Sequence, residues 1–234
     1  IDGQRAAGGS GRFADVYNPA TGEVQAKVPL ATRDETDDAV ARAAAAQPKW
    51  GATNPQRRAR VLMEFVRLLN RDMDKLAEVL SSEHGKTLPD ARGDIQRGLE
   101  VIEFCIGAPH LLKGEYTDNA GPGIDIYSMR QPLGVVAAIM PFNFPAMMPL
   151  WHVGPALACG NAVVLKPSER DPSVPLMLAE LLVEDAEARR VEEQPQVRGG
   201  DHRQDGGREV GGAHEAAGGR PRVRPQRHDQ REES

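Results

Sequence analysis

The sequence predicts an α/β protein in which amphipathic helices precede the opening β-α-β unit of a Rossmann-like parallel sheet, followed by a disordered tail. Residues 134–170 read as strand, loop, helix and strand. The segments before them repeat apolar residues at helical spacing. Residues 185–234 contain no Leu, Ile, Met, Phe, Trp or Tyr, so they cannot bury enough apolar surface to fold. We expect residues 1–184 to be ordered and residues 185–234 to be a low-complexity tail.

Composition and charge argue against several classes of function. The formal net charge of −5, with ten Arg of the tail offset by eleven acidic residues, predicts no nucleic-acid or membrane-surface partner. No apolar stretch reaches the roughly 18 residues of a membrane span without Pro, Gly or charge. Two cysteines in apolar surroundings indicate a reducing compartment, and we expect a cytoplasmic location. The sequence starts at Ile1 without Met and shows no signal peptide, as in a processed or partial product.

The first predicted elements are a hairpin and a helix. Residues 13–17 and 23–28 read as strands joined by turn-forming residues. Thr32, with Glu35 three positions later, predicts a capping box at the start of an alanine-rich helix. We expect Pro48 to end that helix, because proline lacks the backbone N–H that the helix interior needs.

Three further helices follow. Asn54 caps the first, with Pro55 at its first position. The second covers about residues 72–83, with Gly85 as its C-cap, and the third covers about residues 90–106. The predicted inward faces are Val61, Leu62, Phe65, Leu68, Leu69, Leu76, Val79, Leu80, Ile95, Leu99, Ile102 and Ile106.

Residues 123–132 read as an extended segment, and the β-α-β unit comes next. Its first strand, from Gly134, is rich in valine and suits a fully buried parallel strand. Pro145 is expected in the first turn of the helix, and Gly160 is expected to stop it. A second short strand ends at Lys166. Ligands of open α/β sheets bind at the carboxyl ends of the strands, so this edge is the predicted functional site.

Five short motifs follow one another along the ordered part. They are Tyr17-Asn18-Pro19-Ala20-Thr21-Gly22, Glu83-His84-Gly85-Lys86, Pro132-Leu133-Gly134-Val135, Pro141-Phe142-Asn143-Phe144-Pro145 and Lys166-Pro167-Ser168-Glu169. Together they resemble the amino-terminal part of the aldehyde dehydrogenase family and imply the amino-terminal part of its fold. Phe142 in place of the commoner Trp, together with residues 146–151 and 158–161, resembles the CoA-acylating methylmalonate-semialdehyde dehydrogenases. The resemblance implies NAD-dependent oxidation of a (methyl)malonate-type semialdehyde to an acyl-CoA, with NAD as cofactor and CoA as co-substrate.

The resemblance gives Asn143 a catalytic role. It matches the asparagine that stabilises the oxyanion in the family. A carboxamide suits this task because its N–H donates a hydrogen bond without itself titrating. Considered by itself, Asn143 could equally serve only the Pro-flanked turn in which it lies.

The same resemblance assigns cofactor-binding residues. Lys166 and Glu169 match the pair that holds the adenosine ribose of NAD, and a carboxylate there favours NAD over its 2′-phosphate relative. Arg170 lines the adenine side, while Met140 and Phe142 contact the cofactor through backbone atoms and ring packing. The alternative from the residues alone is a solvated charged loop after a strand.

Neither cysteine is a candidate nucleophile. Cys159 ends an apolar helix with no base near it in the sequence, and Cys105 lies on the inward side of another helix, so both are expected to be packing residues. His84, His110 and His152 lack the spacing of metal ligands, and we predict no metal site.

The sequence departs from the family after Glu184. The nucleophilic cysteine and the second glycine loop of the family have no counterpart, so we expect this chain by itself to be inactive. The tail, with Arg but no Lys, resembles out-of-frame translation, and a frameshift, truncation or assembly error is our hypothesis for it. The alternative function is a non-catalytic nucleotide-binding or oligomerisation fragment. Residues 123–132 match the oligomerisation strand of the family, so a homo-oligomer is expected for the intact relative.

Overall fold

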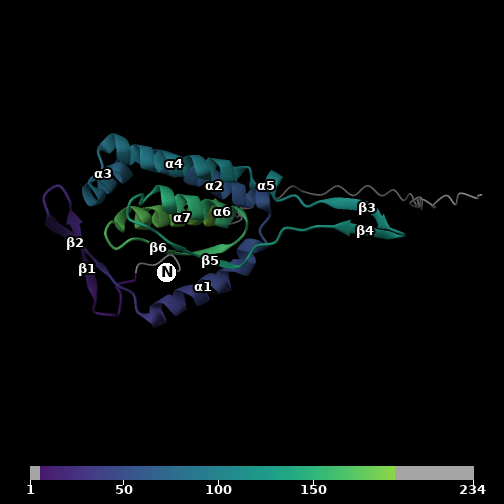
Figure 1. The fold of residues 1–234 in the computed structure, drawn as a ribbon, viewed down its shortest axis with the longest axis horizontal. Helices are drawn as coiled ribbons and strands as arrows, with labels where there is room; N and C mark the ends of the chain where they lie inside the picture. The colour runs from purple at the N-terminus through teal and green to yellow at the C-terminus, as the bar shows by residue number, and fades with distance from the viewer. Residues whose placement is uncertain (1–5, 193–234) are drawn as a thin grey trace, which may run out of the picture. The chain divides into compact units, whose positions relative to one another are not determined.

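The computed structural model describes residues 6–192, with side chains described for residues 6–184. The described chain is α/β, as predicted (Figure 1). The strands are β1 (Phe13–Asn18), β2 (Glu23–Pro29), β3 (Tyr116–Gly121), β4 (Ile124–Tyr127), β5 (Val135–Ile139) and β6 (Ala162–Lys166). The helices are α1 (Arg33–Gly51), α2 (Pro55–Arg71), α3 (Met73–His84), α4 (Leu88–Ile106), α5 (Ala108–Leu111), α6 (Met147–Ala158) and α7 (Ser173–Glu192).

The predicted β-α-β unit is present as β5, α6 and β6. The two strands are parallel, and their register runs from Val135 opposite Ala162 to Ile139 opposite Lys166. The pair lies between α6 on one face and α1 on the other (Figure 1). Our expectation that the first strand is fully buried was wrong, since Ile139 is 76% exposed. Within the described residues the sheet consists of these two strands alone, so part of its surface stays open.

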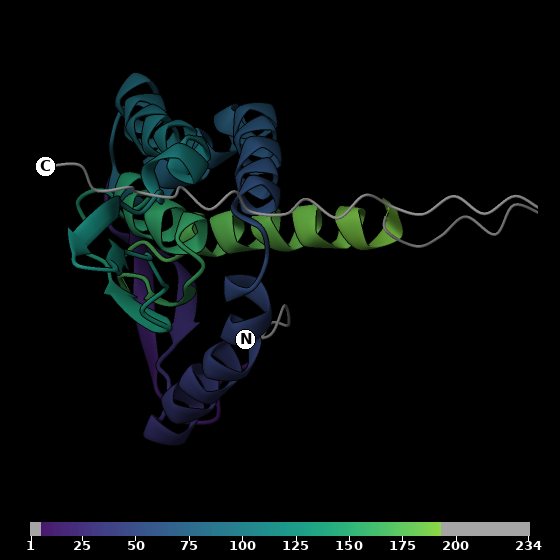
Figure 2. The same cartoon turned by 90° about the vertical axis from the view of Figure 1, so that its right-hand side faces the viewer.

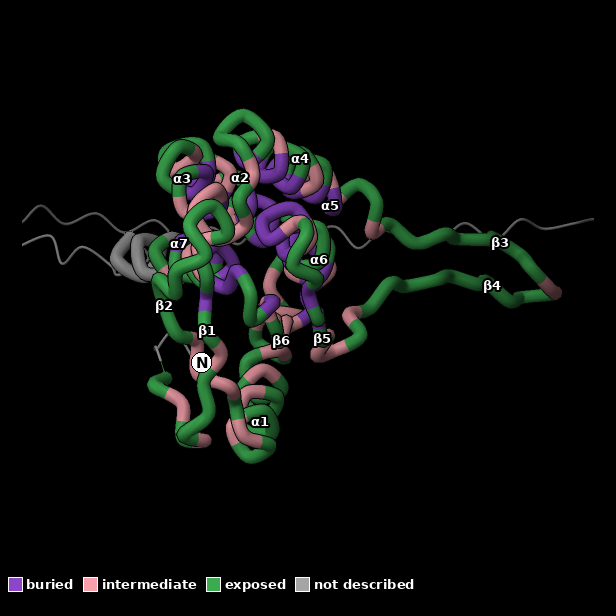
Figure 3. Tube along the Cα trace, turned by 60° about the vertical axis from the view of Figure 1, so that its left-hand side comes forward, coloured by how far each residue is buried: buried purple, intermediate pink, exposed green. Residues whose placement is uncertain are grey.

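The hydrophobic core lies among α2, α3, α4, α6 and α7. Figure 3 shows the buried positions concentrated where these helices face one another. The predicted inward faces of α2, α3 and α4 are buried except for Val61, Val79 and Ile106, which are partly exposed. At Gly98 a Cβ atom would meet the Leu150 side chain at 2.5 Å, so a glycine lets α4 and α6 approach closely.

The predicted helix caps are confirmed. The Glu35 N–H donates to Thr32 Oγ1 at 3.1 Å, and the Thr32 N–H donates to Glu35 Oε2 at 2.7 Å, which completes the capping box. Asn54 caps α2. Gly85 ends α3 with a φ of 84°, a left-handed conformation that glycine adopts without a Cβ clash.

Two proline expectations were wrong. Pro48 lies inside α1, which continues to Gly51. Only about one turn follows this proline, and the indole Nε1 of Trp50 holds that turn by donating to the Leu157 carbonyl oxygen at 3.0 Å. Pro145 lies before α6 rather than in its first turn, because the helix begins at Met147.

The extended segment at residues 123–132 forms part of a projecting hairpin. β4 pairs antiparallel with β3, a strand that the sequence had not predicted. The hairpin extends away from the helices (Figures 1 and 3). Ile124, Ile126 and Tyr127 are all more than half exposed, so the hairpin offers an apolar surface.

Helix α7 packs along α2 and α3 and crosses beneath them in Figure 2. It continues to Glu192, past residue 184, where we expected the ordered part to end. Residues 185–190 read Asp-Ala-Glu-Ala-Arg-Arg, and the Ala, Glu and Arg among them are good helix formers. The rest of the predicted tail, residues 193–234, lies outside the described residues. No helix within the described range could cross a membrane.

Candidate functional site

The predicted site residues gather at one edge of the sheet. β5 and β6 are parallel and end together, with Ile139 opposite Lys166. Phe142 and Asn143 follow the end of β5, and Glu169 lies three residues after the end of β6. The β-α-β topology therefore brings two stretches about 25 residues apart to the same edge, where open α/β sheets bind ligands.

The predicted cofactor residues contact one another in two pairs. Lys166 Nζ lies 3.1 Å from Glu169 Oε2. The Arg170 guanidinium lies over the Phe142 ring, 4.5 Å from its centroid, within the range of a cation–π contact. This stacking joins the loop after β5 to the loop after β6, so the four side chains form one patch.

The patch is accessible and carries an ionised carboxylate. The side chains of Lys166 and Glu169 are 57% and 50% exposed. The backbone N–H of Glu169 and the Lys166 ammonium hold the pKa of the Glu169 carboxyl below its usual value. Met140 differs from this group because it is buried, and its N–H donates to the Lys166 carbonyl oxygen at 3.0 Å. Its backbone extends the β5–β6 ladder to the edge of the site.

Asn143 is exposed, and its loop is anchored through the backbone. The Lys86 ammonium donates to the Asn143 carbonyl oxygen at 2.9 Å and lies 4.3 Å from the centroid of the Phe144 ring. The same ammonium pairs with Asp94 Oδ2 at 2.7 Å. Asp94 Oδ1 in turn accepts from the Met147 N–H at 2.7 Å. This lysine and aspartate hold the middle of the loop, at Asn143, and its end, at Met147.

The sequence analysis did not predict that Lys86 and Asp94 anchor the loop of Asn143. Lys86 appeared only within a motif, as the residue after the C-cap glycine, and Asp94 lies in the middle of an amphipathic helix. One signal in the sequence could have indicated the role of Asp94. This acidic residue lies one position before Ile95 and four before Gly98, on the side of α4 that is buried.

A groove lies beside the patch, along the outer side of β6. Its volume is ≈ 530 Å³. The carboxyl half of β6 and the loop after it form one side, and the end of β2 with the start of α1 forms the other. The lining residues are Ala6, Gly8, Val28, Pro29, Leu30, Ala31, Glu35, Thr36, Ala39, Val164, Leu165, Lys166, Pro167, Ser168, Glu169 and Pro172. A smaller hollow of ≈ 220 Å³ lies near Asn143, between Phe144 and the first turns of α4, with Lys86 and Arg97 in its wall.

The loop between β6 and α7 contains a buried acid, Asp171. Asp171 is 3% exposed, and its Oδ1 atom has no hydrogen-bond partner among the described residues. Burial raises its pKa to about 7, and the Glu83 and Asp94 carboxylates act in the same direction, while the Ser168 hydroxyl and Lys86 oppose it. The loop that carries Glu169 therefore also contains a buried acid with a raised pKa.

Of the two cysteines predicted to be packing residues, Cys105 is buried and Cys159 is partly exposed. Cys105 is 4% exposed, and burial raises the pKa of its thiol to about 11, so it carries almost no thiolate at neutral pH. Cys159 lies just before β6, at the end of the sheet opposite Lys166. Neither thiol is at the site edge. Over the described residues, no cluster of His, Cys, Asp and Glu could hold a metal ion.

Sequence comparison relates the chain to known proteins. The profile of the aldehyde dehydrogenase family matches residues 6–189. Malonate-semialdehyde dehydrogenase of Pseudomonas aeruginosa is 52% identical over 184 residues, which cover 79% of this chain and 37% of that protein. The mitochondrial acylating methylmalonate-semialdehyde dehydrogenase of Arabidopsis thaliana is 52% identical over 175 residues, or 75% of this chain and 29% of that protein.

Solved structures give the same result for the fold. A proposed methylmalonate-semialdehyde dehydrogenase of Sinorhizobium meliloti, solved with NAD, matches with a TM-score of 0.78 and 65% identity over 79% of this chain and 38% of its own. Methylmalonate-semialdehyde dehydrogenase of Oceanimonas doudoroffii matches with a TM-score of 0.77 and 49% identity, with the same coverage. The chain thus spans less than two-fifths of the length of these relatives.

Proposed function

This chain belongs to the aldehyde dehydrogenase family, and from that premise we propose that its ordered part is the NAD-binding half of a CoA-acylating (methyl)malonate-semialdehyde dehydrogenase site. The observation that carries the proposal is the patch of Phe142, Lys166, Glu169 and Arg170 beside Asn143 at the carboxyl edge of the sheet. The names of the relatives supply the substrate class and the acylating reaction, and the Sinorhizobium structure supplies the cofactor.

The exposed groups at this edge fit NAD. The ionised Glu169 carboxylate accepts hydrogen bonds from ribose hydroxyls, and Lys166 donates to the same hydroxyls or to phosphate. The negative charge of Glu169 repels a 2′-phosphate, which favours NAD over NADP. Bound NAD would supply the hydride acceptor for the oxidation. Asn143 contributes its amide N–H to the oxyanion that develops on the aldehyde oxygen.

The proposal includes inactivity of this chain by itself. Acyl transfer to CoA passes through a thioester on an enzyme cysteine, and neither Cys105 nor Cys159 lies at the site edge. The test measures NADH formation by the purified chain with malonate semialdehyde, NAD and CoA. We expect none. Turnover that Asn143→Ala abolishes would refute the inactivity and support the oxyanion role.

NAD binding is the direct test of the cofactor patch. Calorimetric titration of NAD compares the original chain with Glu169→Gln, which keeps the shape and removes the charge. We expect Glu169→Gln to weaken binding about tenfold, since a hydrogen bond to a charged group contributes roughly 1.5–3 kcal/mol. Glu23→Gln, an exposed position of β2, serves as the matched control. Equal affinities of all three proteins would contradict the assignment.

The second candidate is a non-catalytic nucleotide-binding or oligomerisation fragment. The β3–β4 hairpin favours it, because Ile124, Ile126 and Tyr127 are more than half exposed on a projecting element. The expectation is a concentration-dependent homo-oligomer by sedimentation, which Ile126→Lys converts to monomer. A monomeric original chain at all concentrations would eliminate the oligomerisation role. NAD binding without turnover would favour the nucleotide-binding role.

A further inference from the structure

The chain turns sharply between α3 and α4, at Glu83-His84-Gly85-Lys86. Gly85 has a φ of 84° and ends α3 in the left-handed conformation. Glu83 lies in the last turn of the helix, and Lys86 follows the glycine. These four residues, here the 83–86 corner, contribute no side chain to the cofactor patch. Their contacts nevertheless reach both loops of the candidate site.

Glu83 holds the far end of the loop after β6. The Ser173 N–H donates to Glu83 Oε2 at 3.0 Å, and the Ser173 hydroxyl donates to the other oxygen of the same carboxylate. Ser173 is the first residue of α7 and follows the loop of residues 167–172, which carries Glu169 and Arg170. An N–H at the start of a helix needs an acceptor, and the helix dipole favours a carboxylate there. The loop is thus fixed at one end by strand β6 and at the other by Glu83.

Lys86 holds the loop after β5. Its ammonium donates to the Asn143 carbonyl oxygen at 2.9 Å and lies 4.3 Å from the centroid of the Phe144 ring. The same two loops meet again at the site edge, where the Arg170 guanidinium lies over the Phe142 ring. The corner and this stack therefore join the two loops at separate points, and a displacement of either loop would break a contact at one of them.

The corner itself is supported by the β1–β2 hairpin. A Cβ atom on Gly85 would lie 2.8 Å from Pro19 Cγ, so the turn of the hairpin packs directly against the corner. Gln25 of β2 donates from Nε2 to the Ser82 carbonyl oxygen at 3.0 Å and accepts from the Ser82 hydroxyl at 2.7 Å. Loops that bind ligands are normally positioned by a rigid scaffold, and the corner is such a fixed support.

We propose that the 83–86 corner is a positioning element of the site: Glu83 and Lys86 hold the loop after β6 and the loop after β5 in the arrangement that binds NAD. The link to NAD rests on the proposed function, whereas the control of the two loops does not. The dinucleotide spans both loops, and a site whose loops are already ordered loses less conformational entropy on binding. Loss of either contact therefore weakens binding, although neither residue belongs to the patch.

Calorimetric titration of NAD tests the effect of Glu83 on the cofactor. Glu83→Ala removes both acceptors of Ser173, and we expect the affinity for NAD to fall about tenfold because the loop must be ordered on binding. Glu83→Gln keeps one acceptor oxygen for the Ser173 N–H, so we expect it to change the affinity by less than about threefold. Glu78→Ala, at an exposed position of the same helix, is the matched control and is expected to bind like the original chain. All titrations are run below the unfolding transition of every variant.

Amide hydrogen exchange, resolved by NMR, reads the two loops separately. The Arg170 N–H donates to Ser168 Oγ at 3.1 Å and reports on the loop after β6. The Met148 N–H donates to the Phe144 carbonyl oxygen at 3.2 Å and reports on the loop after β5. Global loosening of the chain accelerates both amides, so the ratio of their rates within one protein isolates a local effect.

Two variants are expected to move this ratio in opposite directions. We expect Glu83→Ala to raise the exchange rate of the Arg170 amide about tenfold relative to that of the Met148 amide. Lys86→Met combined with Asp94→Asn removes the ammonium without leaving a buried charge unpaired. This double variant is expected to raise the rate of the Met148 amide relative to that of the Arg170 amide.

Each readout has a result that overturns the proposal. An unchanged affinity for NAD in Glu83→Ala would remove the link between the corner and the cofactor. An unchanged ratio of exchange rates in both variants, even with reduced stability, would show that the corner only stabilises the fold. Where Glu83→Ala does not fold, Ser173→Ala, which removes the hydroxyl contact alone, is compared in its place. Failure of the original chain to bind NAD would refute the proposed function, and the exchange ratio alone would then decide whether the corner positions the loops.

Discussion

Lys86 Nζ lies 2.7 Å from Asp94 Oδ2 and, on its other side, 2.9 Å from the carbonyl oxygen of Asn143. The aspartate side chain is 1% exposed and the lysine side chain 16%. The loop that carries the predicted oxyanion residue is thus fixed by a charge pair that is almost out of solvent. Because a buried charge is stable only when it is paired, the loop and the pair depend on each other.

The first prediction concerns this pair. Asp94→Ala leaves the Lys86 ammonium without its partner and the Met147 N–H without its acceptor, so we expect a loss of about 3–5 kcal/mol of unfolding free energy. Urea denaturation measures it. Asp74→Ala is the matched control, since Asp74 pairs with Arg92 at 2.9 Å but its side chain is 76% exposed, and such pairs contribute about 0–1 kcal/mol. Equal losses in both variants would contradict the role of burial.

The second prediction uses two glycines of α4. A Cβ at Gly98 would lie 2.5 Å from Leu150 Cδ1 and 3.1 Å from the Met147 backbone, whereas a Cβ at Gly93 would meet nothing within 4 Å. We expect Gly98→Ala to destabilise by about 1–3 kcal/mol through overpacking. Gly93→Ala is expected to stabilise by about 0.5–1 kcal/mol through helix propensity. Thermal unfolding of both variants measures the difference, and a stabilising Gly98→Ala would show that α4 and α6 are not in close contact.

These cases show which features a single sequence predicts. The capping box of Thr32 and Glu35 and the left-handed cap at Gly85 involve neighbouring residues, so local chemistry was sufficient. The contact of Lys86 with Asn143 joins residues 57 positions apart, and the sequence carries no signal for which helices pack together. The close approach at Gly98 was missed for the same reason.

The missed strand β3 has a different cause. Its sequence, Tyr-Thr-Asp-Asn-Ala-Gly, contains residues with low strand propensity. Asn119 has a positive φ of 49°, and the register with β4 shifts between Thr117 and Gly121. The strand exists because β4 supplies a partner, which is a tertiary effect. At the site, the edge of the sheet was predictable from strand order, whereas the stacking of Arg170 on Phe142 was not.

The third prediction concerns Asp171 and pH. Its pKa is raised to about 7 in the folded chain, against about 3.9 for an unperturbed aspartate, so the folded state binds the proton more tightly. The contribution of this group to stability is therefore full below about pH 4 and is lost as the pH rises through about 7. We expect the stability of the original chain, relative to Asp171→Asn, to fall by roughly 2–4 kcal/mol over that range.

Urea denaturation at a series of pH values measures this difference. The neighbouring Glu83, Lys86 and Asp94 remain in both proteins, so they contribute to both curves. Ser168→Ala removes the hydroxyl that lowers the pKa of Asp171 and is expected to move the transition to higher pH. Parallel stability curves for the original chain and Asp171→Asn would contradict the raised pKa.

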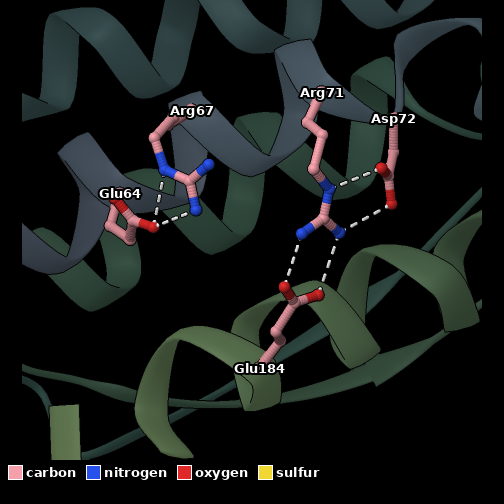
Figure 4. A network of polar contacts seen from close by, with 5 residues as sticks. All are labelled: Glu64, Arg67, Arg71, Asp72 and Glu184. Atoms are coloured by element: carbon pink, nitrogen blue, oxygen red, sulfur yellow. Dashed lines mark hydrogen bonds and ion pairs between the residues drawn. The ribbon is translucent and has the colours of Figure 1, made fainter. Parts of the chain in front are cut away.

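The last prediction concerns the polar network that ties α7 to the end of α2. Arg71 donates to both carboxylate oxygens of Glu184, at 2.5 and 2.9 Å, and to both oxygens of Asp72, at 2.7 and 3.0 Å (Figure 4). The Arg71 guanidinium holds the pKa of both carboxyl groups below their usual values. Their contribution to stability is therefore present at neutral pH and is lost as the pH falls through the lowered values.

Because the guanidinium fork contacts two carboxylates at once, we expect Arg71→Lys to lower the urea midpoint, although the charge is kept. Glu184→Gln is expected to lower the urea midpoint as well. We expect high salt to make this effect of Glu184→Gln smaller, because the charged groups are exposed to solvent and are screened. Glu78→Gln in α3 is the control, since Glu78 is an exposed helical glutamate and the substitution removes the same charge. If Arg71→Lys had no effect on the midpoint while Glu184→Gln lowered it, the network would act through charge alone, and the bidentate geometry of Figure 4 would contribute nothing to holding α7.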